Sequence, residues 1–148
     1  MNKIKVLTVR MPWAALIMLG LKNIENRTWT TSYRGKIVIH ASAQNHDAEW
    51  MGARYMCQKL GVKFPDGDMM LSKTGELLGV VTLSDIAQPF ITMSLKMHAW
   101  QVEDNYGWVL ENPIPFPITL PIKGKLGLWE LSDDFQVPDS VKQIISPS

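Results

Sequence analysis

Six short segments with the composition of β-strands are the feature that most constrains how this chain can fold. They comprise residues 4–9, 22–29, 36–41, 77–83, 106–110 and 125–131. Each is rich in β-branched, aromatic or alternating residues and is bounded by turn-forming residues, which is typical of strands. Few connections carry the helix that a parallel crossover needs, so the strands are expected to be mostly antiparallel. The sequence therefore predicts an α+β fold, a small, partly closed β-barrel with helices packed at one side.

Two helices are predicted between the early strands. The first begins at Pro12, where a missing N–H costs nothing, and ends at Gly20, which can adopt a left-handed stop. The second covers residues 47–60, with acidic residues in its first turn and Gly61 after its last. Its apolar stripe comprises Trp50, Ala53, Cys57 and Leu60.

The later part of the chain holds less regular segments. Residues 112–121 contain prolines at positions 113, 115, 117 and 121. Because proline cannot donate to a β-ladder, this stretch is predicted to form an irregular wall or a sheet edge, not a central strand. Residues 61–75 are predicted to form an exposed excursion, and a short helix is predicted after Phe90. We divide the chain into a domain of residues 1–132 and a tail of residues 133–148 that packs on it or partly frays.

The length and cysteine content are those of a single domain without a disulfide or a Cys-rich zinc site. The 148 residues suffice for one domain, and a single cysteine, Cys57, permits neither an internal disulfide nor a Cys-rich zinc site. Residues 1–9 alternate lysines with apolar residues and lack the apolar core of a signal peptide. No apolar run has the length of a transmembrane helix. A cytoplasmic location, without membrane association, is therefore expected.

Charge is distributed unevenly along the chain. The formal net charge is +1, yet residues 1–44 contain seven basic residues and one acidic residue, a net +6. The rest contains eight basic and thirteen acidic residues, a net −5. Such asymmetry favours an anionic partner met on one face. Lys3, Lys5 and Lys36 are expected to be simply solvated.

The first group of candidate functional residues lies in the sequence GLKNIENR at residues 20–27. Gly20 permits a tight turn into a strand, and Lys22 follows at its mouth. Residues two apart on a strand share a face, so Glu25 and Arg27 point the same way. A carboxylate can accept from the N–H groups of a base, while Lys and Arg can hold a phosphate or a carbonyl oxygen. The alternative is an ion pair of little energetic consequence.

A second group joins the first strand to the first helix. Arg10 leaves the strand near a helix N-terminus, where anions bind. Trp13 can stack on a base or contribute to the core, and the sequence leaves both open.

A third group accompanies the second and third strands. Trp29 and Arg34 add an aromatic and a basic side chain, and Ser42 ends the third strand. His40 alternates with Val38, so it points into the cleft or serves as a satisfied structural group. Trp50, Trp108 and Trp129 are expected to fill the core.

The order of these groups resembles a known family. The matching blocks are VRMPWA at 9–14, GLKNIENRTW at 20–29, YRGK at 33–36, HAS at 40–42, GVVTL with the following Asp85 at 79–85, YGW at 106–108 and KGKLGLW at 123–129. Together they resemble the ASCH (activating signal cointegrator homology) domain, whose hallmark G-x-K-x-x-E-x-R is met by Gly20, Lys22, Glu25 and Arg27. The resemblance implies a PUA-like fold, a small β-barrel with helices beside its mouth. It also implies a cleft at this motif that binds RNA or a nucleotide.

The resemblance also implies an enzymatic alternative, but this chain departs from the residues that the enzymes use. One branch of the superfamily, the small N4-acetylcytidine amidohydrolases, uses a threonine nucleophile, a lysine and a glutamate. That threonine falls where this chain has Glu25, whereas Lys22 matches the lysine. Thr28, Thr30 and Thr31 lie nearby but off the motif position. A second departure is Met11, where glutamine often precedes the proline.

Three functions are therefore carried forward. The first is binding of RNA or a modified nucleotide by Arg10, Trp13, Lys22, Glu25, Arg27, Trp29, Arg34, His40 and Ser42. The second is a metal-independent hydrolase, acting on a nucleoside amide or as a ribonuclease, with Glu25 as general base and Lys22 as electrostatic stabiliser. The third is a protein-interaction domain. His40, His46 and His98 have no metal-ligand spacing, so neither a metal nor another cofactor is expected.

Overall fold

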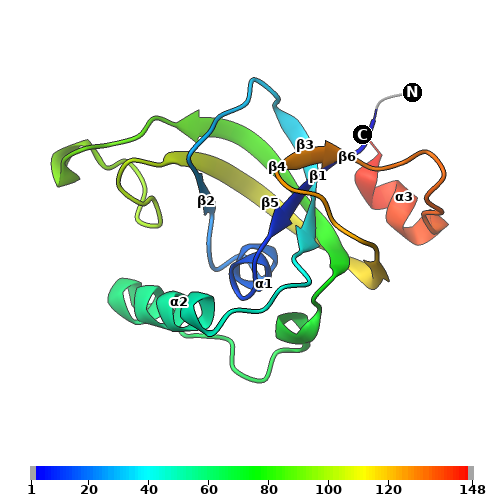
Figure 1. The fold of residues 1–148 in the computed structure, drawn as a ribbon, viewed down its shortest axis with the longest axis horizontal. Helices are drawn as coiled ribbons and strands as arrows, with labels where there is room; N and C mark the ends of the chain where they lie inside the picture. Colours follow the sequence, from blue (N-terminus) through cyan, green and yellow to red (C-terminus); the bar gives the residue numbers. More distant parts are fainter. Residues whose placement is uncertain (1–2, 147–148) are drawn as a thin grey trace.

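The computed structural model describes residues 3–146, and residues 147–148, at the end of the tail that was predicted to fray, lie outside them. A six-stranded mixed sheet curls into a half-barrel with three α-helices around it (Figure 1). The strands are β1 (Lys5–Val9), β2 (Ile24–Arg27), β3 (Gly35–Ala41), β4 (Glu76–Ala87), β5 (Tyr106–Pro121) and β6 (Leu128–Glu130). The helices are α1 (Trp13–Met18), α2 (Asp47–Leu60) and α3 (Asp139–Ile145), with short 3-10 helices η1 (Met69–Ser72) and η2 (Met93–Leu95). The predicted α+β, PUA-like half-barrel is thus confirmed.

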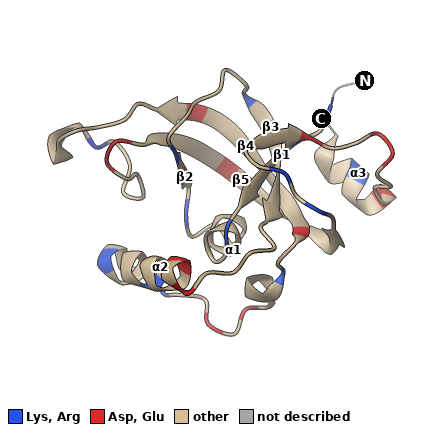
Figure 2. Ribbon diagram, viewed as in Figure 1, with Lys and Arg blue, Asp and Glu red and all other residues tan. Residues whose placement is uncertain are grey.

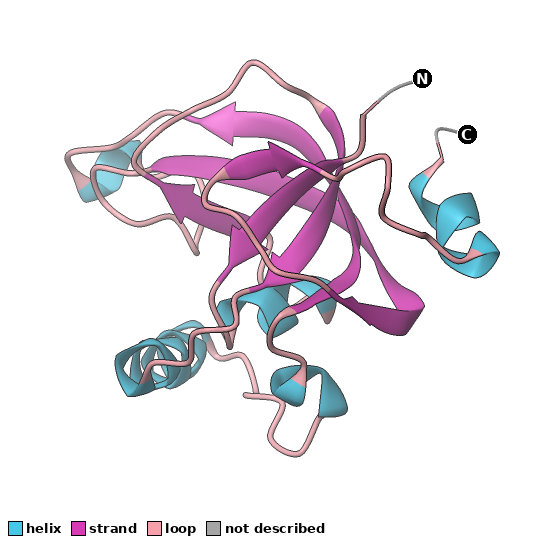
Figure 3. Ribbon diagram, turned by 45° about the vertical axis from the view of Figure 1, so that its right-hand side comes forward, coloured by secondary structure: helices cyan, strands magenta, loops and turns pink. Residues whose placement is uncertain are grey.

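The strand order is β2-β5-β4-β3-β1-β6. Figure 3 shows the curl of this sheet from a second side, with the strands in magenta. Neighbouring strands are antiparallel, as predicted, except β1 and β3, which pair in parallel from Val6 opposite Val38 to Val9 opposite Ala41. The chain passes through α1 and β2 between these two strands, and this connection is long enough for the parallel pairing.

The proline-rich segment corrects one prediction. β5 continues as a strand through all four prolines, with Pro115 opposite Gly79 and Pro121 opposite Glu76 on β4. Only residues 106–109 of β5 also pair with β2, so the proline-rich half has a ladder on one side alone. The predicted edge position is therefore right and the predicted irregular wall is wrong. α3 packs on this half, where Val141 is fully buried among apolar side chains that include Phe116 and Leu120.

Three other strands differ in length from the prediction. β4 extends to Ala87, four residues beyond the predicted end, because β5 offers partners as far as Gly107. β6 is confined to residues 128–130, and residues 125–127 form a loop that ends at Gly127 with a φ of 71°. β2 begins at Ile24, so Lys22 belongs to the turn before it.

The core lies on both faces of the sheet, because α1 covers one face and α3 the other. α1 is buried over most of its length and packs with Leu7, Ile37, Ile39 and Trp108. Trp129 is buried with the α3 side of the sheet, and Trp50 is half-buried beside the α1 side. α2 has the predicted bounds and buries Ala53 and Cys57 of its stripe. Within the described residues, no helix combines the length and apolar character that crossing a bilayer requires.

Candidate functional site

A cavity of about 720 Å³ lies between α1, β2 and α2 on one side and the segment joining β5 to β6 on the other. Its volume falls within the roughly 300–1,000 Å³ of small-molecule sites. Seven of the nine predicted binding residues line it, namely Arg10, Trp13, Lys22, Glu25, Arg27, His40 and Ser42. The sequence therefore identified most of one wall of this cavity.

A glycine turn places the motif in the cavity. Gly20 has a φ of 76°, a conformation that other residues adopt only with strain. Its N–H donates to the Ile17 carbonyl at 3.0 Å, and the Lys22 N–H donates to the Leu16 carbonyl at 3.1 Å. α1 thus ends abruptly and the chain enters β2 with Lys22 beneath the cavity, as predicted from the glycine.

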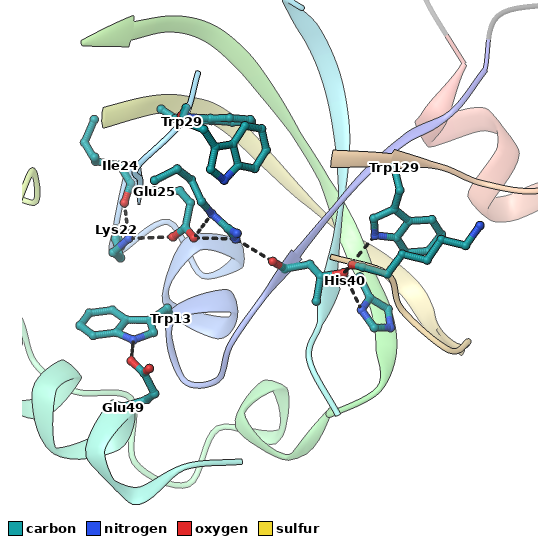
Figure 4. A network of polar contacts seen from close by, with 12 residues as sticks. Trp13, Lys22, Ile24, Glu25, Trp29, His40, Glu49 and Trp129 are labelled. Carbon is teal, nitrogen blue, oxygen red and sulfur yellow. Dashed lines mark hydrogen bonds and ion pairs between the residues drawn. The ribbon is translucent and has the colours of Figure 1, made fainter. Parts of the chain in front are cut away.

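Lys22, Glu25 and Arg27 form a connected charged cluster on the cavity floor (Figure 4). Lys22 Nζ lies 3.4 Å from Glu25 Oε1 and also donates to the Ile24 carbonyl. The Arg27 guanidinium contacts the other carboxylate oxygen, Glu25 Oε2, with its Nε at 3.0 Å and a terminal nitrogen at 2.9 Å. The same guanidinium donates to the Thr8 carbonyl at 2.6 Å, which ties β2 to β1. The cluster is therefore a connected ion-pair network and not an exposed pair.

Burial sets the electrostatics of the charged cluster. Lys22 is 4% exposed and Glu25 is 8% exposed, so both charges are largely removed from water. Burial lowers the pKa of Lys22 from its ordinary value, and the charge and hydrogen bond of Glu25 oppose this shift. Each ionic group depends on its partner, because an unpaired buried charge is strongly unfavourable.

Trp13 and Arg10 meet at Glu49 of α2. Trp13 Nε1 donates to Glu49 Oε1 at 2.9 Å, and Arg10 donates to Glu49 Oε2 at 2.9 Å. The Trp13 hydrogen bond, followed by Arg10, holds the pKa of Glu49 below its ordinary value, against the effect of burial. Lys22 Nζ lies 5.4 Å from the centroid of the Trp13 ring. Trp13 therefore packs on the core and lines the cavity, which joins the two roles that the sequence left open.

His40 occupies the opposite side of the cavity, where Figure 4 shows it below Trp129. Its Nε2 lies 2.9 Å from the Ile122 carbonyl oxygen, which can only accept, so Nε2 carries a proton. Its Nδ1 faces Thr8 Oγ1 at 3.3 Å. Burial lowers the pKa of His40, opposed by the bond to Ile122. Ser42 also lines the cavity, and its hydroxyl accepts from the Gln44 N–H at 3.2 Å.

Trp29 and Arg34, predicted to bind ligand, lie outside the cavity wall. Trp29 is 37% exposed and packs edge-on against Trp108, with ring centroids 4.9 Å apart. Arg34 donates to the carbonyls of Thr31 and Tyr33 in its own loop, each at 2.9 Å. The Arg34 guanidinium is thus bound within its own turn, whereas the sequence analysis had expected it to line the cleft.

The basic residues of the first third are spread over several elements, as the blue positions on the ribbon in Figure 2 show. Lys3 pairs with Asp133 at 3.0 Å, Lys5 with Glu130 at 3.7 Å and Arg10 with Glu49 at 2.9 Å. Acids from the rest of the chain therefore compensate three of the seven basic residues of residues 1–44. Lys3 and Lys5 therefore form ion pairs, whereas the sequence analysis predicted that they are simply solvated.

Comparison with known proteins follows the same blocks of sequence. The family model of the ASCH domain matches residues 7–119. The chain belongs to the ASCH domain family. It is 28% identical over 130 residues to Activating signal cointegrator 1 of Homo sapiens and 27% identical over 130 residues to that of Mus musculus. Each match covers 84% of this chain and 22% of the relative, so the chain spans about a fifth of their length.

Met11 stands at the position where the resemblance led us to expect a glutamine. Its side chain is fully buried in the main core and does not line the cavity. The threonines near the motif in sequence, Thr28, Thr30 and Thr31, lie off the cavity wall. Thr8, which the sequence analysis did not consider, lines it. Among residues 3–146, no three His, Cys, Asp or Glu side chains gather into a group suited to a metal.

Sequence reasoning missed the far wall of the ASCH cavity. Residues 122–127, here called the lysine loop, close it with Lys123 and Lys125, a signal available as two lysines flanking a glycine. Trp100 and Val102 complete another side and are held by Asn26 of the motif. Asn26 donates to the Trp100 carbonyl at 2.9 Å and accepts from the Val102 N–H at 2.7 Å. These contacts join segments that are more than 70 residues apart, which local sequence patterns do not reveal.

Proposed function

We propose that this ASCH domain binds RNA or a modified nucleotide in the cavity above the charged cluster. The observation that carries the proposal is Glu25, buried between Lys22 and Arg27 at the floor of an open cavity. A carboxylate offers about four lone-pair sites, and the two cations occupy only part of them. Glu25 can therefore still accept from the N–H edge of a base.

The wall residues complete this mode of recognition. Arg27 and Lys22 are placed to meet a carbonyl or phosphate oxygen beside Glu25. The Trp13 ring is held in position by its bond to Glu49 and offers a flat surface for a base. The Arg10 side chain, at the rim of the cavity, is half-exposed and can contact an anion. The ASCH family resemblance, with its implied RNA or nucleotide ligand, supports the same proposal.

A tryptophan pair tests the proposal. Trp13→Leu is expected to lower RNA affinity by about 1–3 kcal/mol, the usual contribution of one base–aromatic stack. Trp50→Leu is the matched control, because Trp50 is also half-buried and also donates through Nε1 but lies outside the cavity wall. Filter binding of short single-stranded RNAs across a salt series would measure both, since phosphate contacts make affinity fall as salt rises. No binding by the native protein even at low salt would contradict the proposal.

Hydrolysis is the second candidate function, favoured by Lys22, which contacts Glu25 and whose pKa burial lowers. In this scheme Glu25 acts as general base and Lys22 stabilises developing charge, without a metal. Incubation of the purified protein with N4-acetylcytidine, and separately with single-stranded RNA, followed by chromatography, tests it. Intact substrates after long incubation would remove this function. Absence of both binding and turnover would leave a protein-interaction role.

A further inference from the structure

The cations that line the cavity divide into paired and unpaired groups. Five basic and two acidic residues line it. Lys22 and Arg27 contact Glu25, and Arg10 contacts Glu49. Lys123 and Lys125 are exposed, and neither has an ion-pair partner within residues 3–146. The uncompensated positive charge of the cavity is therefore concentrated on the lysine loop, visible in Figure 2 as the blue positions between β5 and β6.

The backbone of the lysine loop is hydrogen-bonded to the sheet by two polar side chains, the half-buried Thr8 and the buried His40. Thr8 Oγ1 donates to the Lys125 carbonyl at 2.7 Å and accepts from Trp129 Nε1 at 3.0 Å. His40 Nε2 donates to the Ile122 carbonyl at 2.9 Å. The loop thus has two anchors, from β3 at Ile122 and from β1 at Lys125, one on each side of Lys123. These hydrogen bonds fix the loop backbone from which the Lys123 and Lys125 side chains extend. A fixed backbone reduces the conformational entropy lost when an anion is bound.

Glycine at position 124 is required for this arrangement. A Cβ added there would lie 2.4 Å from His40 Cε1 and 3.2 Å from Thr8 Oγ1. The backbone therefore approaches the two anchoring side chains more closely than any other residue would permit. The close approach leaves Lys123 and Lys125 on either side of the glycine, both at the cavity wall.

We infer that the lysine loop is a phosphate-binding subsite, and that the cavity takes its ligand as part of a single-stranded RNA and not as a free nucleoside. This inference rests on the proposed function and names its substrate class. A nucleoside is uncharged and would leave both lysines without a partner, whereas a strand places phosphates beside the base that enters the cavity. Lysine ammonium groups suit this role because they contact phosphate as mobile point charges without demanding one orientation.

The decisive experiment compares two double variants that remove the same charge. Lys123→Ala with Lys125→Ala removes the subsite, and Lys59→Ala with Lys63→Ala is the control, because both control lysines are exposed and lie outside the cavity wall. Fluorescence anisotropy of a labelled short single-stranded RNA measures affinity between about 50 and about 200 mM salt. Urea unfolding of each variant confirms that the fold is retained, and Lys123→Glu with Lys125→Glu provides a second, stronger perturbation.

The expected result is a change in salt dependence confined to the subsite variant. Loss of two phosphate contacts lowers the slope of log affinity against log salt by about 1.4, at about 0.7 per contact on a single strand. Over a fourfold change in salt this makes the variant about sevenfold less salt-sensitive than the native protein. Charge reversal weakens binding further, and nucleoside 5′-monophosphates displace the RNA better than the matching nucleosides do.

The experiment distinguishes failure of the phosphate-binding subsite from failure of the proposed function. If the subsite variant binds RNA with the native slope, or nucleosides compete as well as their monophosphates, the subsite is refuted while the proposed function stands. If the native protein binds neither RNA nor monophosphates at low salt, the proposed function and the subsite both fail. An equal loss of slope in the control variant would assign the effect to overall charge and would refute the subsite.

Discussion

Replacement of Glu25 by glutamine is the sharpest test of the charged cluster, because it keeps the shape of the side chain and removes its charge. Lys22 is 4% exposed and has Glu25 as its ion-pair partner within the described residues. The side chain of Arg27 is 19% exposed and loses its carboxylate as well. Glu25→Gln therefore leaves two poorly solvated cations side by side in the folded state.

The expected cost follows from this burial. Breaking a buried ion pair by removing one partner costs about 3–5 kcal/mol, because the remaining charge is uncompensated. For a domain of this size each kcal/mol lowers Tm by roughly 2–4 °C, so Tm should fall by roughly 6–20 °C.

The loss should also depend on pH in a defined direction. Burial lowers the pKa of Lys22 below 10.5, so the unfolded chain binds more protons than the folded one between the folded-state value and 10.5. Stability contributed by Lys22 therefore rises with pH across that window. Because glutamine no longer favours the ammonium, the stability deficit of Glu25→Gln should shrink as pH rises and Lys22 is neutralised.

Urea unfolding at neutral pH and at alkaline pH measures both effects. Asp66→Asn is the matched control, since it also turns a carboxylate into an amide beside an arginine, with Arg54 at 2.8 Å, but on the exposed surface. It should leave the unfolding midpoint nearly unchanged, because exposed ion pairs contribute little. The reasoning is refuted if the two variants lose equal stability, or if the deficit of Glu25→Gln is constant with pH.

Two further predictions concern the walls of the cavity. Burial lowers the pKa of His40 below 6.5, so its contribution to stability is complete above that pH and is lost as pH falls through the folded-state value. His40→Gln should flatten the dependence of the urea midpoint on pH between about 7 and about 5, while the exposed His46→Gln should preserve it. Asn26→Ala removes two hydrogen bonds, to Trp100 and Val102, and should cost about 1–3 kcal/mol in urea unfolding. It should also speed amide exchange around Val102, and unchanged exchange would show that Asn26 does not hold that wall.

Local patterns were most informative where the structure depends on neighbours in sequence. The helix at residues 47–60 was predicted with its observed bounds, because its periodicity, acidic first turn and Gly61 all act within a few residues. The strand Gly35–Ala41 and the turn at Gly20 follow from the same kind of information. The proline-rich half of β5 was misjudged because β4 supplies its ladder and α3 its cover, and both are distant in sequence.

The sequence by itself determined the inner wall of the site, because Glu25 and Arg27 share a strand face and Gly20 brings Lys22 to its edge. Tertiary structure alone decided which other groups complete the cavity, namely Glu49 from α2 and the lysine loop from beyond β5. It also kept Arg34 in its own turn. Side-chain direction along a strand is a local property with a period of two, whereas the opposite side of a cavity is selected by packing over the whole domain.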